Sequence, residues 1–278
     1  MEVVQSSQQL AGLCRAAPRE LGLVPTMGAL HDGHLALVRQ ARRENATLAV
    51  SIFVNPSQFG PQEDLSQYPS DLERDLELLR SEGADLVFTP DAVEMYPRGF
   101  DTWVDAGDLA NRLEGASRPG HFRGVATIVT KLFNLFSPDR AYFGQKDGQQ
   151  LAVIRRLVRD LGMGLEIVAV PTVREADGLA MSSRNLYLTP DQRQAAPVVY
   201  RALAAAEKLW QQGVKDAERL RQETRRVLQE ETLVERIDYV SVADADSLEE
   251  LDVLVRRAMV SVAVQLGKPR LIDNIILE

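Results

Sequence analysis

Short apolar runs alternate with segments of helical periodicity along residues 21–170. Runs of this kind favour buried strands, because a parallel sheet that is covered on both faces needs nearly continuous apolar residues. A strand followed by a helix and another strand is the βαβ unit. Strands are predicted at 21–26, 47–54, 84–88, 140–144 and 165–170, and helices at 35–45, 72–79, 125–136 and 151–161.

Two other stretches of this first part carry weaker patterns. Residues 1–20 are predicted to form an amphipathic helix that ends at Pro18, because proline breaks a helix interior. Residues 91–119 have an irregular pattern rich in glycine, aspartate and proline, with a short strand expected at 102–105.

The pattern changes after Thr189. Helices are predicted at 191–212 and 216–230, and strands at 236–242, 257–266 and 270–277. The last two strands flank a turn at 267–269 and are expected to pair antiparallel. We therefore predict an α/β fold, with a Rossmann-like parallel sheet in an N-terminal domain (residues 1–180) and a smaller α+β C-terminal lid domain (residues 181–278).

The composition narrows the class of protein. Of the 278 residues, 45% are hydrophobic and 26% charged, which is typical of a soluble globular protein. No apolar run approaches a membrane span and the N-terminus has no secretory pattern, so we expect a cytoplasmic protein without a membrane partner. A single cysteine, Cys14, excludes an intrachain disulfide and a cysteine-cluster metal site. The net charge of −8 disfavours a nucleic-acid partner.

A predicted strand, a glycine-bearing turn and a predicted helix meet at residues 25–35. This layout presents backbone N–H groups and a helix N-terminus to a phosphate. His31 and His34 are two of the three histidines and lie at the turn, three residues apart, so they are expected to share one helix face. Imidazole donors there suit the charge that builds up on a phosphate. The alternative is that each histidine caps the helix or faces solvent.

Polar segments also follow two other predicted strands. Residues 55–61 leave the carboxyl end of a strand, where ligands of open α/β sheets bind, so Gln58 is a candidate ligand contact. Lys146 follows the strand at 140–144 and is placed like a point charge for phosphate, with Gln150 one helical turn further on. The alternatives are ordinary turn chemistry at 55–61 and a simple helix cap at Asp147.

Two further segments carry cations. The loop at 171–185 is the longest polar loop, and its residues 181–184 supply two hydroxyls and one guanidinium suited to phosphate. The alternative there is a helix start capped by serines. Arg118, His121 and Arg123 precede or begin a predicted helix, where cations oppose the helix dipole, so they suit an anion or a carboxylate better than they suit the helix itself. The alternative is that each is a surface charge on a loop.

Five of these segments together resemble the pantoate–β-alanine ligases, which belong to the H-x-G-H nucleotidyltransferase superfamily. The segments are PTMGALHDGH at 25–34, FVNPSQF at 53–59, RPGHFRG at 118–124, FGQKDGQQ at 143–150 and PTVREADGLAMSSRN at 171–185. The resemblance implies that ATP and pantoate form a pantoyl adenylate and pyrophosphate, and that β-alanine then attacks the acyl carbon to give pantothenate, the vitamin B5 precursor of coenzyme A, and AMP. It also implies Mg²⁺ and a homodimer.

The resemblance further assigns residues by motif. His34 would be the catalytic proton donor, with His31, Lys146 and Arg184 neutralising the phosphates. Gln58 and Gln150 would bind pantoate, and Glu114 and Arg118 would line the entrance. No metal ligand is assigned. The residues that would bind ATP are Met27, Gly28, Ala29, Leu30, His31, Asp32, Gly33, His34, Gly144, Gln145, Lys146, Asp147, Val173, Met181, Ser182, Ser183 and Arg184.

Three positions depart from the pattern of the family. Ser70 and Gln145 stand where arginine and glutamate are common, and Gly148 stands where an aromatic residue is common. These departures are expected to affect kinetics and loop order more than the reaction. Two other functions remain open at this point: a nucleotidyltransferase that releases a nucleotide-linked product and no AMP, and a nucleotide-binding sensor without chemistry.

Overall fold

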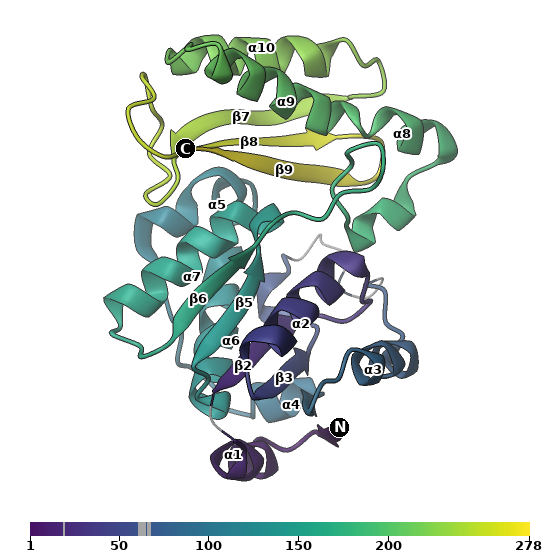
Figure 1. The fold of residues 1–278 in the computed structure, drawn as a ribbon, viewed down its shortest axis with the longest axis vertical. Helices are drawn as coiled ribbons and strands as arrows, with labels where there is room; N and C mark the ends of the chain where they lie inside the picture. The colour runs from purple at the N-terminus through teal and green to yellow at the C-terminus, as the bar shows by residue number, and fades with distance from the viewer. Residues whose placement is uncertain (19, 61–64, 66–67) are drawn as a thin grey trace. The chain divides into compact units, whose positions relative to one another are not determined.

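The computed structural model describes residues 1–18, 20–60, 65 and 68–278 of the chain. Residue 19 of the predicted N-terminal helix and residue 61 of the predicted 55–61 loop lie outside the described residues. The chain divides into two compact units (Figure 1). The first comprises Met1–Gly144 and Val153–Val170, and the second Gln145–Ala152 and Pro171–Glu278.

A six-stranded parallel sheet forms the centre of the first unit, in the order β1-β4-β3-β2-β5-β6. The strand order reverses between β2 and β5, and such a switch point is where ligands of open α/β sheets bind. The predicted α/β fold with a parallel sheet is confirmed. Its strands are β1 (Glu2–Val4), β2 (Leu21–Thr26), β3 (Thr47–Ile52), β4 (Leu86–Phe88), β5 (Arg140–Gly144) and β6 (Glu166–Val170).

Helices accompany these strands because each has one apolar face. In α2, for example, Leu35, Val38 and Ala41 are buried at a spacing of three, which places them on one side of the helix. The α-helices after the strands are α1 (Ser7–Ala16), α2 (Asp32–Glu44), α3 (Leu72–Ser81), α4 (Ala92–Met95), α5 (Leu113–Ser117), α6 (His121–Phe136) and α7 (Gly148–Asp160). The shorter 3₁₀ turns include η1 (Pro56–Gln58), η3 (Gly107–Asn111) and η4 (Gln145–Asp147).

The N-terminal segment differs from its prediction. The first residues form β1, which pairs parallel with β4 through Glu2 with Leu86 and Val4 with Phe88. The prediction of a helix over 1–20 is therefore wrong for Glu2–Val4. Val3 and Val4 are β-branched residues, which favour a strand, and here they form part of the edge strand of the sheet. Helix α1 begins after Ser6, whose side chain accepts from the backbone of Gln9, and it ends before Pro18 as predicted.

The short strand expected at 102–105 is also wrong, since these residues belong to no strand. The N–H of Val104 donates to the hydroxyl of Thr127 at 3.0 Å, on α6, instead of to a neighbouring strand. A side-chain acceptor has replaced the sheet ladder here.

Three helices begin earlier than predicted. Helix α2 begins at Asp32, α6 at His121 and α7 at Gly148, each three or four residues before its apolar periodicity starts. His34, His121 and Gln150 therefore lie in the first turns of these helices and not in the preceding loops. The apolar pattern marks where a helix becomes buried, and the first turn extends beyond that point.

The second unit is a three-stranded antiparallel sheet, in the order β7-β8-β9, with two helices packed on one face. The predicted antiparallel pair at the end of the chain is confirmed. The predicted helix at 191–212 divides before Val198, because Pro197 interrupts it. The second unit includes η4 and the first residues of α7, which lie within Gln145–Ala152. Its other elements are η5 (Ser183–Tyr187), α8 (Pro190–Ala195), α9 (Val198–Gln211), α10 (Ala217–Gln229), β7 (Arg236–Asp244), β8 (Ala258–Gln265) and β9 (Arg270–Leu277).

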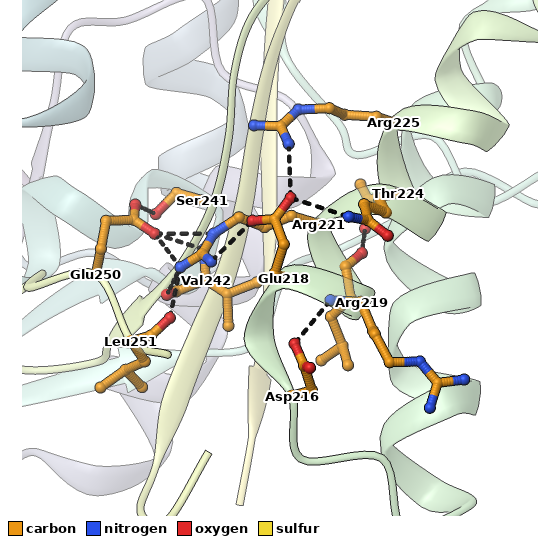
Figure 2. Close-up of polar contacts among 12 residues, drawn as sticks. Asp216, Glu218, Arg219, Arg221, Thr224, Arg225, Ser241, Val242, Glu250 and Leu251 are labelled. Carbon is orange, nitrogen blue, oxygen red and sulfur yellow. Dashed lines mark hydrogen bonds and ion pairs between the residues drawn. The ribbon is translucent and has the colours of Figure 1, made fainter. Parts of the chain in front are cut away.

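Arg221 of α10 forms hydrogen bonds to strand β7 of this sheet and to the segment that follows it (Figure 2). The guanidinium of Arg221 donates to the carbonyl oxygens of Val242 at 3.0 Å and Leu251 at 2.6 Å. It also donates to the carboxylate of Glu250 at 2.5 and 3.1 Å, and Glu250 in turn accepts from the hydroxyl of Ser241. Because these groups satisfy one another, the polar cluster stabilises the helix–sheet packing. The helices of the described residues fall short of the length and apolarity that a bilayer-spanning helix requires.

Candidate active site

The turn between β2 and α2 is held in a strained shape that requires glycine. Gly28 has φ +83°, and a Cβ there would lie 3.0 Å from Oδ2 of Asp75 and 3.1 Å from Cγ2 of Ile52. The hydroxyl of Thr26 accepts from the N–H of Gly28 at 3.3 Å and donates to the carbonyl oxygen of Ser51 at 2.8 Å. The backbone at Gly28 is thereby tied to the two central strands.

A buried carboxylate supports the rest of the turn. Asp75, on α3, is 1% exposed and accepts from the N–H groups of Ala29 and Leu30, each at 2.8 Å. These two N–H groups are therefore engaged within the protein, and the binding of ATP by this turn stays a prediction. Asp75 was not predicted from the sequence, although its spacing from Leu72 and Leu79 places a charge on the apolar face of a predicted helix.

The two histidines of the turn lie against each other, as their spacing predicted. Their ring centroids are 4.1 Å apart with planes inclined at 33°. His31 caps α2, because its Nδ1 accepts from the N–H of Gly33 at 3.1 Å. Nδ1 therefore carries no proton, and the proton of this neutral ring is on Nε2. His31 can therefore cap the helix through Nδ1 and donate a hydrogen bond through Nε2 at the same time. His34 lies in the first turn of the same helix.

Gln58 lies at the end of η1 and contacts the histidine turn. Its Nε2 donates to the sulfur of Met27 at 3.1 Å, and its Oε1 accepts from Nδ2 of Asn55 at 3.0 Å. Asn55 is 1% exposed, and its Oδ1 accepts from the hydroxyls of Ser57 at 2.9 Å and Tyr96 at 2.7 Å. Asn55 thus holds Gln58 in place from inside the protein, and Tyr96 is a supporting residue that was not predicted from the sequence.

The third histidine braces the backbone of Gln58. Nδ1 of His121 is 2.9 Å from the carbonyl oxygen of Gln58, and Nε2 is 3.2 Å from Nη1 of Arg118. A carbonyl oxygen only accepts and a guanidinium only donates, so His121 is neutral with its proton on Nδ1. The structure therefore brings Arg118 and His121 together at Gln58. Arg123 has another partner, since its guanidinium lies 4.6 Å above the ring of Trp103.

A pocket of the second unit gathers polar side chains from three segments. Lys146 comes from η4, Ser182 and Arg184 from the loop around η5, and Arg270 and Asp273 from β9. The side chain of Lys146 is 18% exposed, and its Nζ is 3.3 Å from a carboxylate oxygen of Asp147. Two cations and a hydroxyl predicted to bind phosphate therefore line one pocket.

Asn185 also lines this pocket and was not predicted. Its Nδ2 donates to a carboxylate oxygen of Glu175 at 3.2 Å and to the carbonyl oxygen of Ala180 at 3.1 Å. Its Oδ1 is buried without a hydrogen-bond partner among the described residues. A buried acceptor of this kind is suited to an N–H or O–H donor of a ligand.

The remaining predicted residues have mixed surroundings. The N–H of Met181 donates to the carbonyl oxygen of Val173 at 3.0 Å. The hydroxyl of Ser182 accepts from the N–H of Arg184 at 3.3 Å, so the serine-cap alternative holds for Ser182. Gln150 is half-buried in the first turn of α7, and Glu114 is buried on α5. Within the described residues, no three His, Cys, Asp or Glu side chains gather as a metal site.

Three comparisons bear on what these sites do. A family described as pantoate–beta-alanine ligase matches residues 1–276. A pantothenate synthetase of Roseiflexus sp. (strain RS-1) is 56% identical over 278 residues, which is 100% of both chains. A crystal structure of pantothenate synthetase from Thermus thermophilus is 51% identical, with a TM-score of 0.94 and 99% of each chain covered. A pantoate–beta-alanine ligase from Francisella tularensis, complexed with beta-gamma ATP and beta-alanine, is 34% identical, with a TM-score of 0.79 over 99% of this chain and 97% of that one.

Proposed function

This chain belongs to the pantoate–β-alanine ligase family and is an ATP-dependent ligase, and from that premise we propose that it condenses pantoate with β-alanine through a pantoyl adenylate. The observation that carries this is the meeting of Lys146, Ser182 and Arg184 in one pocket. An ammonium, a hydroxyl and a guanidinium are the donors that a triphosphate requires.

The first step joins two anions. A carboxylate oxygen of pantoate attacks the α-phosphorus of ATP, and the bond from that phosphorus to pyrophosphate breaks. Like charges repel along this path, so donors aimed at the phosphate oxygens lower the barrier. We assign this work to Lys146 and Arg184, together with the imidazoles of His31 and His34. Nε2 of His31 is the proton-bearing nitrogen of its ring, as this role requires.

The second step uses the acyl adenylate. The amine of β-alanine attacks the acyl carbon, the carbon–oxygen bond to AMP breaks, and the amine loses a proton. We assign pantoate to the amides of Gln58 and Gln150, because its hydroxyls and carboxylate need both donors and acceptors. Gln58 uses one N–H on the weak sulfur acceptor of Met27, and its other N–H is the one assigned to pantoate.

The described residues form no cluster of carboxylates or imidazoles fit for a resident metal. Mg²⁺ commonly keeps several waters and binds through the phosphates of a nucleotide. We therefore propose that Mg²⁺ enters with ATP as part of the substrate and that no protein cage holds it.

We further propose that residues 1–180 bind ATP and pantoate and that residues 181–278 act as a lid that keeps water from the adenylate. We also propose a cytoplasmic homodimer without nucleic-acid or membrane partners. Light scattering on the eluting protein tests the dimer, because a dimer has twice the 30.9 kDa mass of the chain.

A product assay tests the proposed reaction. Mass spectrometry after incubation with ATP, Mg²⁺, pantoate and β-alanine should show pantothenate, AMP and pyrophosphate in equal amounts. Lys146→Ala and Arg184→Ala should each reduce the yield, while Lys208→Ala, an exposed lysine on α9, should not. Release of ADP and phosphate, or of a nucleotide-linked product without AMP, would refute the proposal.

A further inference from the structure

Strand β9 carries two consecutive polar residues within an otherwise mostly apolar sequence. Asp273 and Asn274 are 3% and 4% exposed, so both are buried, whereas the flanking Ile272 and Ile275 are only partly buried. Buried polar side chains are costly unless partners satisfy them. Consecutive residues of a strand point to opposite faces of the sheet, so these two reach different parts of the unit.

Asp273 holds the polar loop that precedes η5. Its two oxygens accept from the guanidinium of Arg174 at 2.5 and 3.1 Å, a bidentate ion pair. Arg174 also donates to the carbonyl oxygen of Gly178 at 3.1 Å and lies 4.0 Å above the ring of Tyr200 on α9. Burial raises the pKa of the Asp273 carboxyl, and the guanidinium opposes that rise. The base of the loop is therefore fixed to β9.

The same loop positions Arg184. A bridge between Arg174 and Ala180 closes the loop into a hairpin. Asn185, the next residue after Arg184, donates to Glu175 and to the carbonyl oxygen of Ala180, as described above. The hairpin therefore places Arg184 relative to Arg174, and through it relative to Asp273.

Asn274 holds the turn that carries Lys146. Its Nδ2 donates to the carbonyl oxygens of Gln145 and Lys146, each at 2.9 Å. Its Oδ1 accepts from Nε2 of Gln145 at 2.9 Å. Carbonyl oxygens only accept, so the orientation of the Asn274 amide is fixed, and each of its polar groups is satisfied.

Gln145 and Gly148, two of the positions that depart from the family pattern, both lie against Asn274. Gln145 supplies the amide N–H that Oδ1 of Asn274 accepts, which a glutamate cannot do when ionised. At Gly148 a Cβ would lie 2.6 Å from the sulfur of Met259 and 3.0 Å from Nδ2 of Asn274. A glycine is therefore what allows the turn to approach the strand.

We propose that Asp273 and Asn274 are positioning residues that hold the Arg184 and Lys146 segments from opposite faces of one strand, and so fix these two cations in the pocket. The proposal rests on the proposed role of both cations in binding the phosphates of ATP. Strand β9 is paired along its length with β8, which makes it a firm base for both segments.

A double-mutant cycle on ATP binding tests this, with the dissociation constant measured by calorimetry on the full chain. Asn274→Ala should weaken ATP binding roughly tenfold, the scale of one or two lost hydrogen bonds. In a Lys146→Ala background the same change should have little further effect, because its target is already gone. Asp273→Asn should also weaken ATP binding in the wild-type chain, and it should have little further effect in an Arg184→Ala background.

Controls keep the test decisive. Ser261→Ala removes a buried hydroxyl opposite Asn274 on β8 that has no hydrogen-bond partner among the described residues, and it should leave ATP binding unchanged. Gln145→Ala removes one bond to Asn274 and serves as a milder variant should Asn274→Ala unfold. If the losses of ATP affinity in the two single variants of a cycle add up in the double variant, the positioning role is overturned, while the phosphate role of the cation stands. Unchanged ATP binding in Lys146→Ala and Arg184→Ala would overturn the phosphate role, and the positioning role with it.

Discussion

The carboxylate of Asp75 accepts a 2.8 Å hydrogen bond from the N–H of Leu30, 45 residues away in the chain. Its other oxygen accepts from Ala29 at the same distance. The glycine turn that carries the histidines is thus shaped by a buried anion of the protein itself. These two N–H groups therefore serve the fold of the turn, and the imidazoles of His31 and His34 beside it are the groups that we propose for the substrate.

Asp75→Asn should destabilise the turn. The substitution preserves shape but turns an amide NH₂ toward a backbone N–H, so one bond is lost and two donors face each other. We expect the free energy of unfolding to fall by about 1–3 kcal/mol, together with a lower kcat/KM for ATP. Urea denaturation and steady-state kinetics measure both. Glu77→Gln, an exposed carboxylate on the same helix, is the matched control, and equal behaviour of the two variants would contradict the role of Asp75.

His31 and His121 should be opposite tautomers at neutral pH. The Nδ1 of His31 accepts from a backbone N–H, whereas the Nδ1 of His121 faces a carbonyl oxygen. Nitrogen-15 chemical shifts should therefore show the proton on Nε2 in His31 and on Nδ1 in His121. The reverse assignment for either ring would contradict the hydrogen-bond pattern.

The loop around Asp177 should lose stability in acid. Hydrogen bonding to Arg193 at 2.6 Å lowers the pKa of the Asp177 carboxyl from its ordinary 3.8. A lowered pKa contributes stability that is fully present above the unfolded value and is lost as the pH falls through the folded value. The difference in unfolding free energy between the wild type and Asp177→Asn should therefore persist above about pH 4 and shrink below it.

Salt and a control variant sharpen that experiment. The Asp177 side chain is 42% exposed, so the difference should also diminish as ionic strength rises. Asp252→Asn changes an exposed carboxylate of the same unit and should show no comparable pH dependence. A wild-type difference that stays constant from pH 7 to pH 2 would exclude the ion pair as its source.

Tyr142→Phe should destabilise the first unit. The Tyr142 hydroxyl is fully buried, accepts from Asn45 at 2.6 Å and donates to Glu44 at 2.9 Å. Burial raises the pKa of Tyr142 to about 12, so the hydroxyl stays protonated across the working range. Its loss should cost about 1–3 kcal/mol in unfolding free energy, measured in urea, because Asn45 loses a buried partner. A cost near zero would show that water replaces the hydroxyl.

Apolar runs predicted the strands of the parallel sheet from β2 to β6 because a strand buried on both faces has a clear sequence pattern. Strand β1 was not predicted because its three residues are too few to show an alternation of apolar and polar side chains. The meeting of Lys146 with Arg184 was implied by the family resemblance, which assigns both side chains to the phosphates. The roles of Asp75 and Asn274 could not be predicted, because the local sequence around a polar residue does not reveal its partner, which here lies 45 to 129 residues away.

Pyrophosphate exchange tests the adenylate most directly. In the absence of β-alanine, labelled pyrophosphate should enter ATP only when pantoate is present, because the first step is reversible and needs no amine. His34→Ala should abolish this exchange while keeping a native circular dichroism spectrum. Folded wild-type protein that forms pantothenate without any pantoate-dependent exchange would contradict the account.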